Sequence, residues 1–167
     1  QRQMCIRDRR YLYPLEAVGA GDSTLAKAYE RDALTMIPTK SKLMPHAREV
    51  LEYLSGKYNL YILSNGFKEL QSHTMRSSGI DEYFKKVVLS DDIGILKPWP
   101  EIFHFALSTT QSELNNSLMI GDSWENDIVG AAGVGMHQVF YNLSGRTDLP
   151  FAPTYQITDL KDLFNFL

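Results

Sequence analysis

The sequence contains very little cysteine: Cys5 is the only one among 167 residues. A single cysteine excludes an internal disulfide framework and a cysteine-based zinc site, and it fits a reducing compartment, so we expect a cytoplasmic protein. No apolar run approaches the roughly 18 residues that indicate a membrane-spanning helix, so we expect no membrane partner. The histidines are scattered along the chain, without the spacing of metal ligands.

Basic residues are too few and too dispersed for a nucleic-acid interface. The chain has 17 lysines and arginines against 20 aspartates and glutamates, a net charge of −3. Residues 1–10 carry +3, which leaves −6 for residues 11–167. No basic stripe is visible in that part, so nucleic acid is not an expected partner. An anionic ligand would have to be bound locally, by a lysine, by backbone N–H groups or by a metal ion.

The opening segment QRQMCIRDRR differs from the rest of the chain. It begins with Gln1 and shows neither helical nor strand periodicity. We interpret residues 1–10 as a foreign segment or scar joined to a truncated gene, because the charge changes abruptly after it. A natural basic tail is the alternative.

Short apolar runs alternate with helical patterns along the remaining residues. Helical spacing runs from Ala17 to Met36, and Pro38 ends it. Leu60–Leu63 is a continuous apolar run closed by Asn-Gly, a pattern typical of a strand buried on both faces. Further strands are expected at 86–90, 117–122, 137–141 and 155–158, and further helices at 46–58, 68–77, 101–109, 124–135 and 159–167.

This alternation predicts an α/β fold, a three-layer Rossmann-like parallel sheet with helices on both faces. In such sheets ligands bind beyond the carboxyl ends of the strands. The residues that directly follow a strand are therefore the candidates for a functional site. They are Ser64-Asn65-Gly66, Ser90-Asp91-Asp92 and Gly121-Asp122-Ser123.

Two carboxylates belong to the strand at 117–122 and the helix after it. Asp122 ends the strand and Asp127 lies in the first turns of the helix, so both can face the crevice at the sheet edge. Such a pair is costly unless one group is protonated or a cation is present, and oxygen ligands of this kind suit Mg²⁺. The alternative is structural: Asp122 ends the strand and Asp127 favours the helix N-terminus.

Two other motifs are suited to an anion. Ser64-Asn65-Gly66 combines a hydroxyl with backbone N–H groups before a helix, where an anion is stabilised. A simple turn in which Ser64 caps the helix is the alternative. Lys97 precedes Pro98 in a loop and could place an ammonium over a phosphate, although a lysine considered alone is more simply a solvated surface residue.

Together these motifs resemble one family. A strand-end Ser-Asn-Gly, a Lys-Pro loop and a strand-end GDxxxxD, in this order, resemble the second, third and fourth motifs of the haloacid dehalogenase-like hydrolases. The stretches LYILSNGF, SDDIGILKPWPEIF and LMIGDSWENDIVGA are most similar to the branch of pyrimidine 5′-nucleotidases that act on noncanonical nucleotides. The resemblance covers residues 41–167.

The resemblance implies a Mg²⁺-dependent phosphatase whose partner is a small phosphorylated substrate, a pyrimidine nucleoside 5′-monophosphate. In this family an aspartate attacks phosphorus, a phospho-aspartyl intermediate forms, and water hydrolyses it while Mg²⁺ and a lysine neutralise charge on the phosphoryl oxygens. Asp127 would act on the metal directly or through a neighbouring ligand. The implied site residues are Ser64, Asn65, Gly66 and Lys97 for phosphate, Lys97 also for catalysis, and Asp122 and Asp127 for Mg²⁺.

The family's first motif, a strand ending in DxDx[TV] that supplies the nucleophile and the acid/base, is absent from the sequence. No aspartate before Ser64 follows an apolar run or has a second aspartate two residues later. By resemblance the missing strand is central, between the strands that end near Ser64 and Asp122. We therefore expect residues 11–40 to be the remnant of a helical cap, residues 41–167 to be the α/β core, and the chain as given to have no phosphatase activity.

Two other functions stay open at this point. A 2-haloacid dehalogenase-type hydrolase belongs to the same superfamily, but it would not need the metal carboxylates of GDSWEND to displace halide from carbon. A noncatalytic anion-binding or scaffolding α/β domain would fit the missing nucleophile. Loss of activity on adding EDTA to the complete protein would separate the phosphatase from the dehalogenase.

Overall fold

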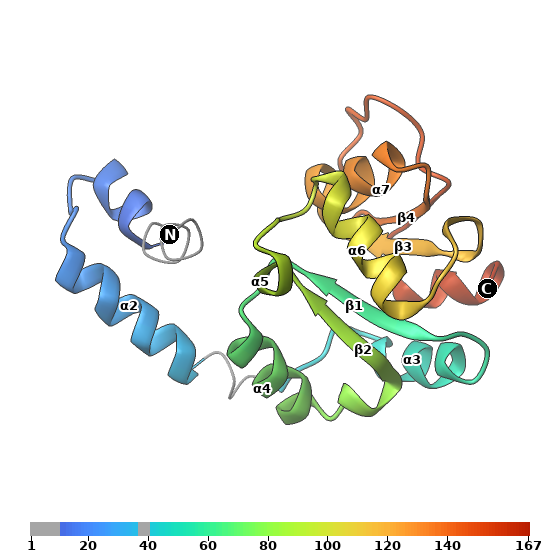
Figure 1. Ribbon diagram of the computed structural model, residues 1–167, viewed down its shortest axis with the longest axis horizontal. Coiled ribbons are helices and arrows are strands. Elements are labelled where there is room, and N and C mark those ends of the chain that lie inside the picture. The colour runs from blue at the N-terminus through green and yellow to red at the C-terminus, as the bar shows by residue number, and fades with distance from the viewer. Residues whose placement is uncertain (1–10, 37–40) are drawn as a thin grey trace. The chain divides into compact units, whose positions relative to one another are not determined.

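The computed structural model describes residues 11–36 and 41–167, so the interpretation of residues 1–10 lies outside the described residues. The chain forms two compact units, and Figure 1 labels most of their helices and strands. One combines Gln1–Lys42 with Gly66–Asp81, and the other combines Leu43–Asn65 with Glu82–Leu167. The segment after Asn65 thus groups with the N-terminal part of the chain, and the cap and core boundaries expected from the sequence remain predictions.

The first unit is helical where it is described. Residues 11–17 are helical, α2 spans Ser23–Met36 and α4 spans Lys68–Ser78. The expected continuous helix from Ala17 to Met36 is wrong, because Gly19 adopts left-handed backbone, at φ 74°, and interrupts it. Asp22 then starts α2 by accepting a 2.7 Å hydrogen bond from the N–H of Thr24.

Short strands and helices alternate in the second unit, as predicted. The strands are β1 (Leu60–Ser64), β2 (Phe84–Leu89), β3 (Leu118–Gly121), β4 (His137–Tyr141) and β5 (Tyr155–Ile157). The helices are α3 (Ala47–Ser55), α5 (Ser90–Ile93), α6 (Pro100–Thr110) and α7 (Val129–Gly133). Shorter turns are η2 (Asp81–Tyr83), η3 (Leu114–Asn116), η4 (Trp124–Ile128) and η5 (Leu160–Asn165).

Two of the expected helices differ from a regular α-helix. The segment after β3 opens with a π-helical turn, η4, because the carbonyl of Ser123 accepts from the N–H of Ile128, five residues later, as well as from that of Asp127. The C-terminal segment winds as a 3₁₀ helix, η5, which Asp159 caps by accepting from the N–H of Lys161. No helix in residues 11–36 and 41–167 is long and apolar enough to cross a membrane.

All strand pairs in the described residues are parallel, as predicted, and they form two sheets, one of β1 and β2 and one of β3, β4 and β5. β1 pairs with β2 from Leu60 opposite Phe84 to Ser64 opposite Leu89, and β4 lies between β3 and β5. Within the described residues, β1 and β3 therefore each have a strand partner on one side only. No residue of β1 is fully buried, so the expected burial on both faces is wrong for this edge strand, although it is right for Val88 and Leu89 of β2.

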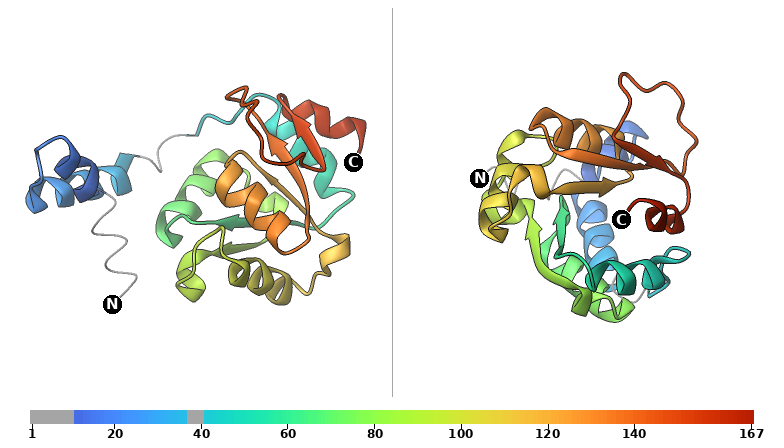
Figure 2. Two further views of the ribbon diagram at one scale, coloured as in Figure 1. Left: turned by 90° about the horizontal axis from the view of Figure 1, so that it is seen from above. Right: turned by 90° about the vertical axis from the view of Figure 1, so that its right-hand side faces the viewer.

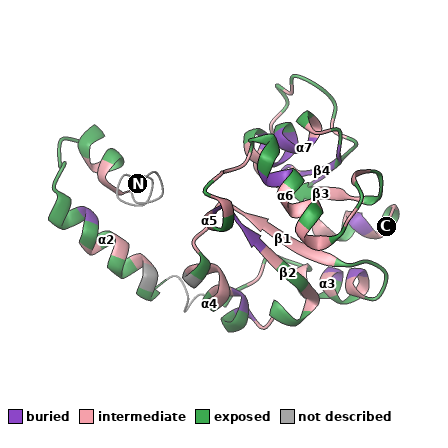
Figure 3. Ribbon diagram, viewed as in Figure 1, coloured by how far each residue is buried: buried purple, intermediate pink, exposed green. Residues whose placement is uncertain are grey.

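Helices cover both faces of the strands (Figure 2). On one face α3 and η5 pack against β4 and β5, and Leu60 of β1 and Leu118 of β3 join the same apolar cluster. On the other face α6 and α7 share a cluster with Leu63 of β1 and Met119 of β3. The buried residues of this unit lie on the strands and on the helix surfaces packed against them (Figure 3). This three-layer α/β arrangement confirms the predicted fold class and places the ends of β1 and β3 in one compact body.

Candidate functional site

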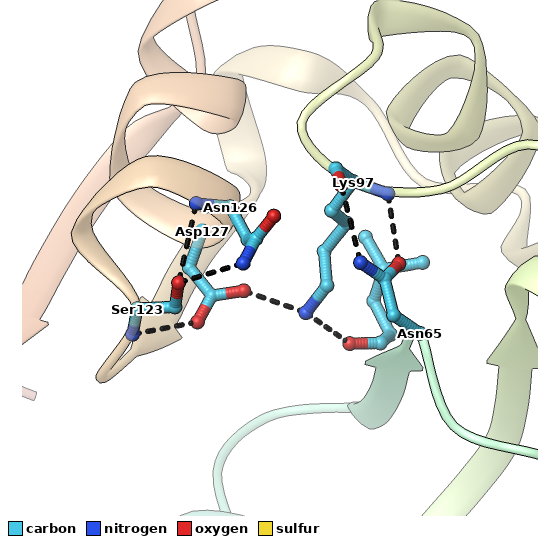
Figure 4. Close-up of polar contacts among 6 residues, drawn as sticks. Asn65, Lys97, Ser123, Asn126 and Asp127 are labelled. Carbon is cyan, nitrogen blue, oxygen red and sulfur yellow. Dashed lines mark hydrogen bonds and ion pairs between the residues drawn. The ribbon is translucent and has the colours of Figure 1, made fainter. Parts of the chain in front are cut away.

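Lys97 links the carboxyl ends of β1 and β3 (Figure 4). It lies in the loop between α5 and α6, and its Nζ donates to the carbonyl oxygen of Leu63 in β1 at 2.7 Å. The same Nζ lies 2.6 Å from Oδ1 of Asp127, in the η4 turn after β3. The fold thus brings together two residues that the sequence analysis selected from separate motifs.

The Lys97–Asp127 ion pair is almost completely shielded from water. The two side chains are 10% and 7% exposed. Attraction between opposite charges strengthens where water is excluded, and either charge alone would be costly there. An ammonium has three N–H donors, and the contacts with described residues use two of them, so one donor is left for a ligand.

The carboxylate of Asp127 is held on its other side by the end of β3. Its Oδ2 accepts a 3.1 Å hydrogen bond from the N–H of Ser123. Gly121 makes room for it, because a Cβ at that position would lie 2.4 Å from Oδ2. Both carboxylate oxygens therefore have an N–H donor, and the carboxylate is aimed at Lys97.

Ser123 begins the η4 turn as its N-cap. Its Oγ accepts from the backbone N–H of Asn126 at 3.3 Å and from Nδ2 of the same residue at 2.9 Å. A serine in this role satisfies donors that the first turn of a helix leaves unpaired. The cap fixes the turn that carries Asp127.

Asn65 reaches Lys97 from the end of β1. Its side-chain Oδ1 accepts from the backbone N–H of Lys97 at 2.8 Å, and its Nδ2 donates to the carbonyl oxygen of Lys97 at 3.1 Å. Asn65 was expected at a phosphate site through its backbone N–H. Its side chain has a different contact, with the Lys97 peptide groups.

The other predicted site residues lie beside this network. Ser64 is the last residue of β1, opposite Leu89, and α4 begins only after Phe67, so the alternative in which Ser64 caps that helix is wrong. Gly66 opens the segment that leads to α4. Asp122 is exposed and directly precedes Ser123. The network thus contains the chain neighbours of Ser64 and of Asp122, while the assignments of Ser64, Gly66 and Asp122 to ligands remain predictions.

One carboxylate of the two predicted as magnesium ligands, that of Asp122, is exposed. Mg²⁺ takes one or two protein carboxylates and completes its shell with water and substrate oxygens, and exposed Asp122 is a donor of the right kind. Asp127 already accepts from Lys97 and Ser123, which makes it the partner of Lys97 in this arrangement. In the described part of the chain, no group of three or more His, Cys, Asp or Glu side chains is arranged to hold a metal ion.

An exposed ion pair borders the η4 turn. Arg146, in the loop after β4, donates from Nη1 to Oε1 of Glu125 at 2.5 Å. This hydrogen bond lowers the pKa of the Glu125 carboxyl and raises the pKa of the Arg146 guanidinium. The guanidinium Cζ also lies 5.8 Å from the ring centroid of buried Trp124. These contacts attach the loop after β4 to the turn that carries Asp127.

Sequence reasoning missed several parts of this network. Gly121 and Ser123 were among the strand-end candidates, but their roles beside Asp127 were not predicted. A small residue at a strand end and a capping serine before a helix are the signals that could have indicated those roles. The carbonyl of Leu63 and the side-chain contacts of Asn65 have no sequence signal, because they depend on where the Lys97 loop folds.

The sequence matches one family profile over most of its length. Residues 6–135 match the haloacid dehalogenase-like hydrolase family. The HAD hydrolase YfnB of Bacillus subtilis is 31% identical over 157 residues, which are 93% of this chain and 64% of YfnB. The pyrimidine 5′-nucleotidase YjjG of Escherichia coli is 31% identical over 126 residues, 74% of this chain and 56% of YjjG. The chain thus spans less than two thirds of the length of either relative.

Solved structures have the same fold. The magnesium-bound structure of YfnB from Bacillus subtilis superposes with a TM-score of 0.86 at 26% identity, covering 100% of this chain and 73% of that one. A 2-haloacid dehalogenase from Pseudomonas syringae superposes with a TM-score of 0.72 at 27% identity, covering 98% of this chain and 70% of that one.

Proposed function

The chain belongs to the haloacid dehalogenase-like hydrolases, and we propose that it carries the phosphate-binding and metal-binding part of a phosphatase for pyrimidine nucleoside 5′-monophosphates. The observation that carries this proposal is the shielded Lys97 ammonium. Leu63 and Asp127 hold it between the ends of β1 and β3, and its contacts with described residues use two of its three N–H donors. The similarity to YjjG, a pyrimidine 5′-nucleotidase, supports the substrate class.

In this proposal the site residues have separate roles. The Ser64 hydroxyl and the backbone N–H groups of Asn65 and Gly66 bind phosphoryl oxygens, and the remaining donor of Lys97 neutralises the charge that grows on them. Asp127 orients the Lys97 ammonium through their ion pair. With these roles, the reacting phosphoryl group would lie at the carboxyl end of β1.

Asp122 would hold Mg²⁺ together with water and substrate oxygens, and Asp127 would support the ion from beside Lys97. When bound, Mg²⁺ supplies positive charge that stabilises the phosphoryl oxygens in the transition state. The YfnB structure with bound magnesium supports this cofactor. The single cysteine of the sequence supports a cytoplasmic site of action.

The nucleophile has to come from a segment that the given sequence lacks, because no Asp-x-Asp occurs in it. The described edges of β1 and β3, each paired on one side only, support a place for an additional parallel strand. We therefore propose that the chain as given does not hydrolyse phosphate esters, and that a strand ending in DxDx[TV] completes the site.

Fusion of an upstream segment carrying DxDx[TV] tests this function. We expect phosphate release from uridine or thymidine monophosphate, loss of release with EDTA, and recovery with excess Mg²⁺. The matched control is the same fusion with its first aspartate replaced by asparagine. A fusion that folds, as judged by cooperative thermal unfolding, but releases no phosphate contradicts the proposal.

The same experiment separates the two alternatives. The structural likeness to a 2-haloacid dehalogenase favours a test with 2-chloropropionate. Chloride release that survives EDTA would identify a dehalogenase, since displacement of halide from carbon needs no metal carboxylate. Binding of inorganic phosphate without any turnover would identify a noncatalytic anion-binding domain.

A further inference from the structure

One amide side chain holds both peptide groups of the lysine in this site. Asn65 accepts from the Lys97 N–H at 2.8 Å and donates to the Lys97 carbonyl at 3.1 Å (Figure 4). This double exchange is the pattern by which two residues of paired antiparallel strands bind each other. The contact joins residues 32 positions apart, so it is a tertiary contact and not a local turn.

The Lys97 loop needs such an anchor. Lys97 lies between α5, which ends at Ile93, and α6, which begins at Pro100, so no helix or strand satisfies its backbone. Its side chain has four rotatable bonds and loses much conformational freedom when its ammonium is held at one place. An anchored backbone reduces the number of positions that the ammonium can reach.

We infer that the Asn65 side chain is a positioning residue for the Lys97 ammonium. Asn65 fixes the backbone at one end of the lysine, and Leu63 and Asp127 bind Nζ at the other. Because each polar atom of the Asn65 amide is bonded to a peptide group of Lys97, we argue its role through the lysine and not through a contact with the ligand. This inference rests on the proposed function only where phosphate affinity is concerned.

The full chain with Asn65→Ala tests the inference, and Asn65→Asp and Asn126→Ala serve as matched variants. Asn65→Asp keeps an acceptor for the Lys97 N–H but loses the donor to its carbonyl. Asn126 is an amide in the same cluster that bonds to Ser123 and has no hydrogen bond to Lys97. It therefore controls for general loosening of the site.

Three measurements are made on each variant. Amide hydrogen exchange of Lys97 reports the Asn65 hydrogen bond, the ¹⁵N signal of the Lys97 ammonium reports its orientation, and titration with inorganic phosphate reports anion binding. The ammonium signal is assigned by its loss in Lys97→Arg. Thermal unfolding of each variant confirms that it is folded.

For Asn65→Ala we expect Lys97 amide exchange to rise about tenfold, the ammonium signal to broaden, and phosphate affinity to fall about tenfold, the effect of one net hydrogen bond. Asn65→Asp should restore part of the amide protection, which also keeps the test decisive if Asn65→Ala does not fold. Asn126→Ala should match the parent chain in the exchange of the Lys97 amide, because Asn126 has no hydrogen bond to the Lys97 backbone.

Two results would overturn the inference. An unchanged Lys97 amide in Asn65→Ala would show that the contact does not hold the loop. A released amide with an unchanged ammonium signal would show that Asn65 supports the loop without orienting the lysine. If the parent chain binds no phosphate, the proposed function fails, while the first two measurements still decide the role of Asn65.

Discussion

The ammonium of Lys97 and the carboxylate of Asp127 form an ion pair of 2.6 Å in which both side chains are nearly buried. The pair connects the loop before α6 to the turn after β3. The Leu63 carbonyl at the end of β1 shares the same ammonium. One lysine therefore joins three segments of the chain at the carboxyl ends of the strands.

Removing one partner of this pair should destabilise the second unit. Asp127→Asn leaves a buried ammonium without its counter-charge, and Lys97→Met leaves a buried carboxylate, so we expect each to lower the free energy of unfolding by about 3–5 kcal/mol. Urea unfolding of the single variants and of Lys97→Met with Asp127→Leu measures the effect. The double variant should recover most of the loss. Single variants as stable as the parent chain would show that the pair is solvated.

A methyl group at Gly121 should displace the Asp127 carboxylate. The Cβ of Gly121→Ala would lie 2.4 Å from Oδ2, so we expect a loss of about 1–3 kcal/mol in the free energy of unfolding and a disturbed Lys97 ammonium signal. Gly133→Ala is the matched control, because a Cβ built at Gly133 meets nothing within 4 Å outside the backbone of its own helix. Equal effects of the two substitutions would contradict the close packing at Gly121.

Magnesium binding should depend on Asp122. We expect Asp122→Asn to weaken the binding of Mg²⁺ alone at least about tenfold, since the change removes a charged oxygen ligand. Isothermal titration calorimetry on the full chain measures this affinity. Asp81→Asn, an exposed aspartate in η2, should leave it unchanged. A parent affinity retained in Asp122→Asn would exclude Asp122 as a ligand.

The Glu125–Arg146 pair should make a small contribution to stability that is lost in acid. Arg146 lowers the pKa of Glu125 below 4.5, so the contribution is present above that ordinary value and disappears as the pH falls through the lowered pKa. Arg146→Gln should return the pKa of Glu125 toward 4.5, as measured by NMR titration of its carboxyl carbon. Arg31→Gln, which removes a guanidinium paired with Asp32 instead, should leave the Glu125 titration unchanged.

Local patterns predicted most of the elements because they depend on neighbouring residues. β4 begins and ends where HQVFY predicts. α4 ends just before Gly79, whose φ of 61° is the left-handed conformation that stops a helix. The failures also have local causes. Gly19 breaks the expected helix before α2. The Ser123 carbonyl accepts from the N–H groups of both Asp127 and Ile128, and this produces the π-helical turn η4.

The burial of a strand was harder to predict from the residues of that strand alone. LYIL has the composition of a strand enclosed on both faces, yet β1 is only half-buried, because one of its sides has no strand partner among the described residues. A strand's burial depends on which strands flank it, and the strand's own residues do not contain that information.

The residue order by itself determined the α/β alternation, the parallel strands and the three motifs at strand ends, since hydrophobic periodicity and turn residues act over a few positions. Only the tertiary structure decided that the Asp127 carboxylate binds the Lys97 ammonium and that the Asn65 side chain binds the Lys97 backbone. Those contacts join residues about 30 positions apart. Their geometry depends on how helices pack on the strands, which no local pattern contains.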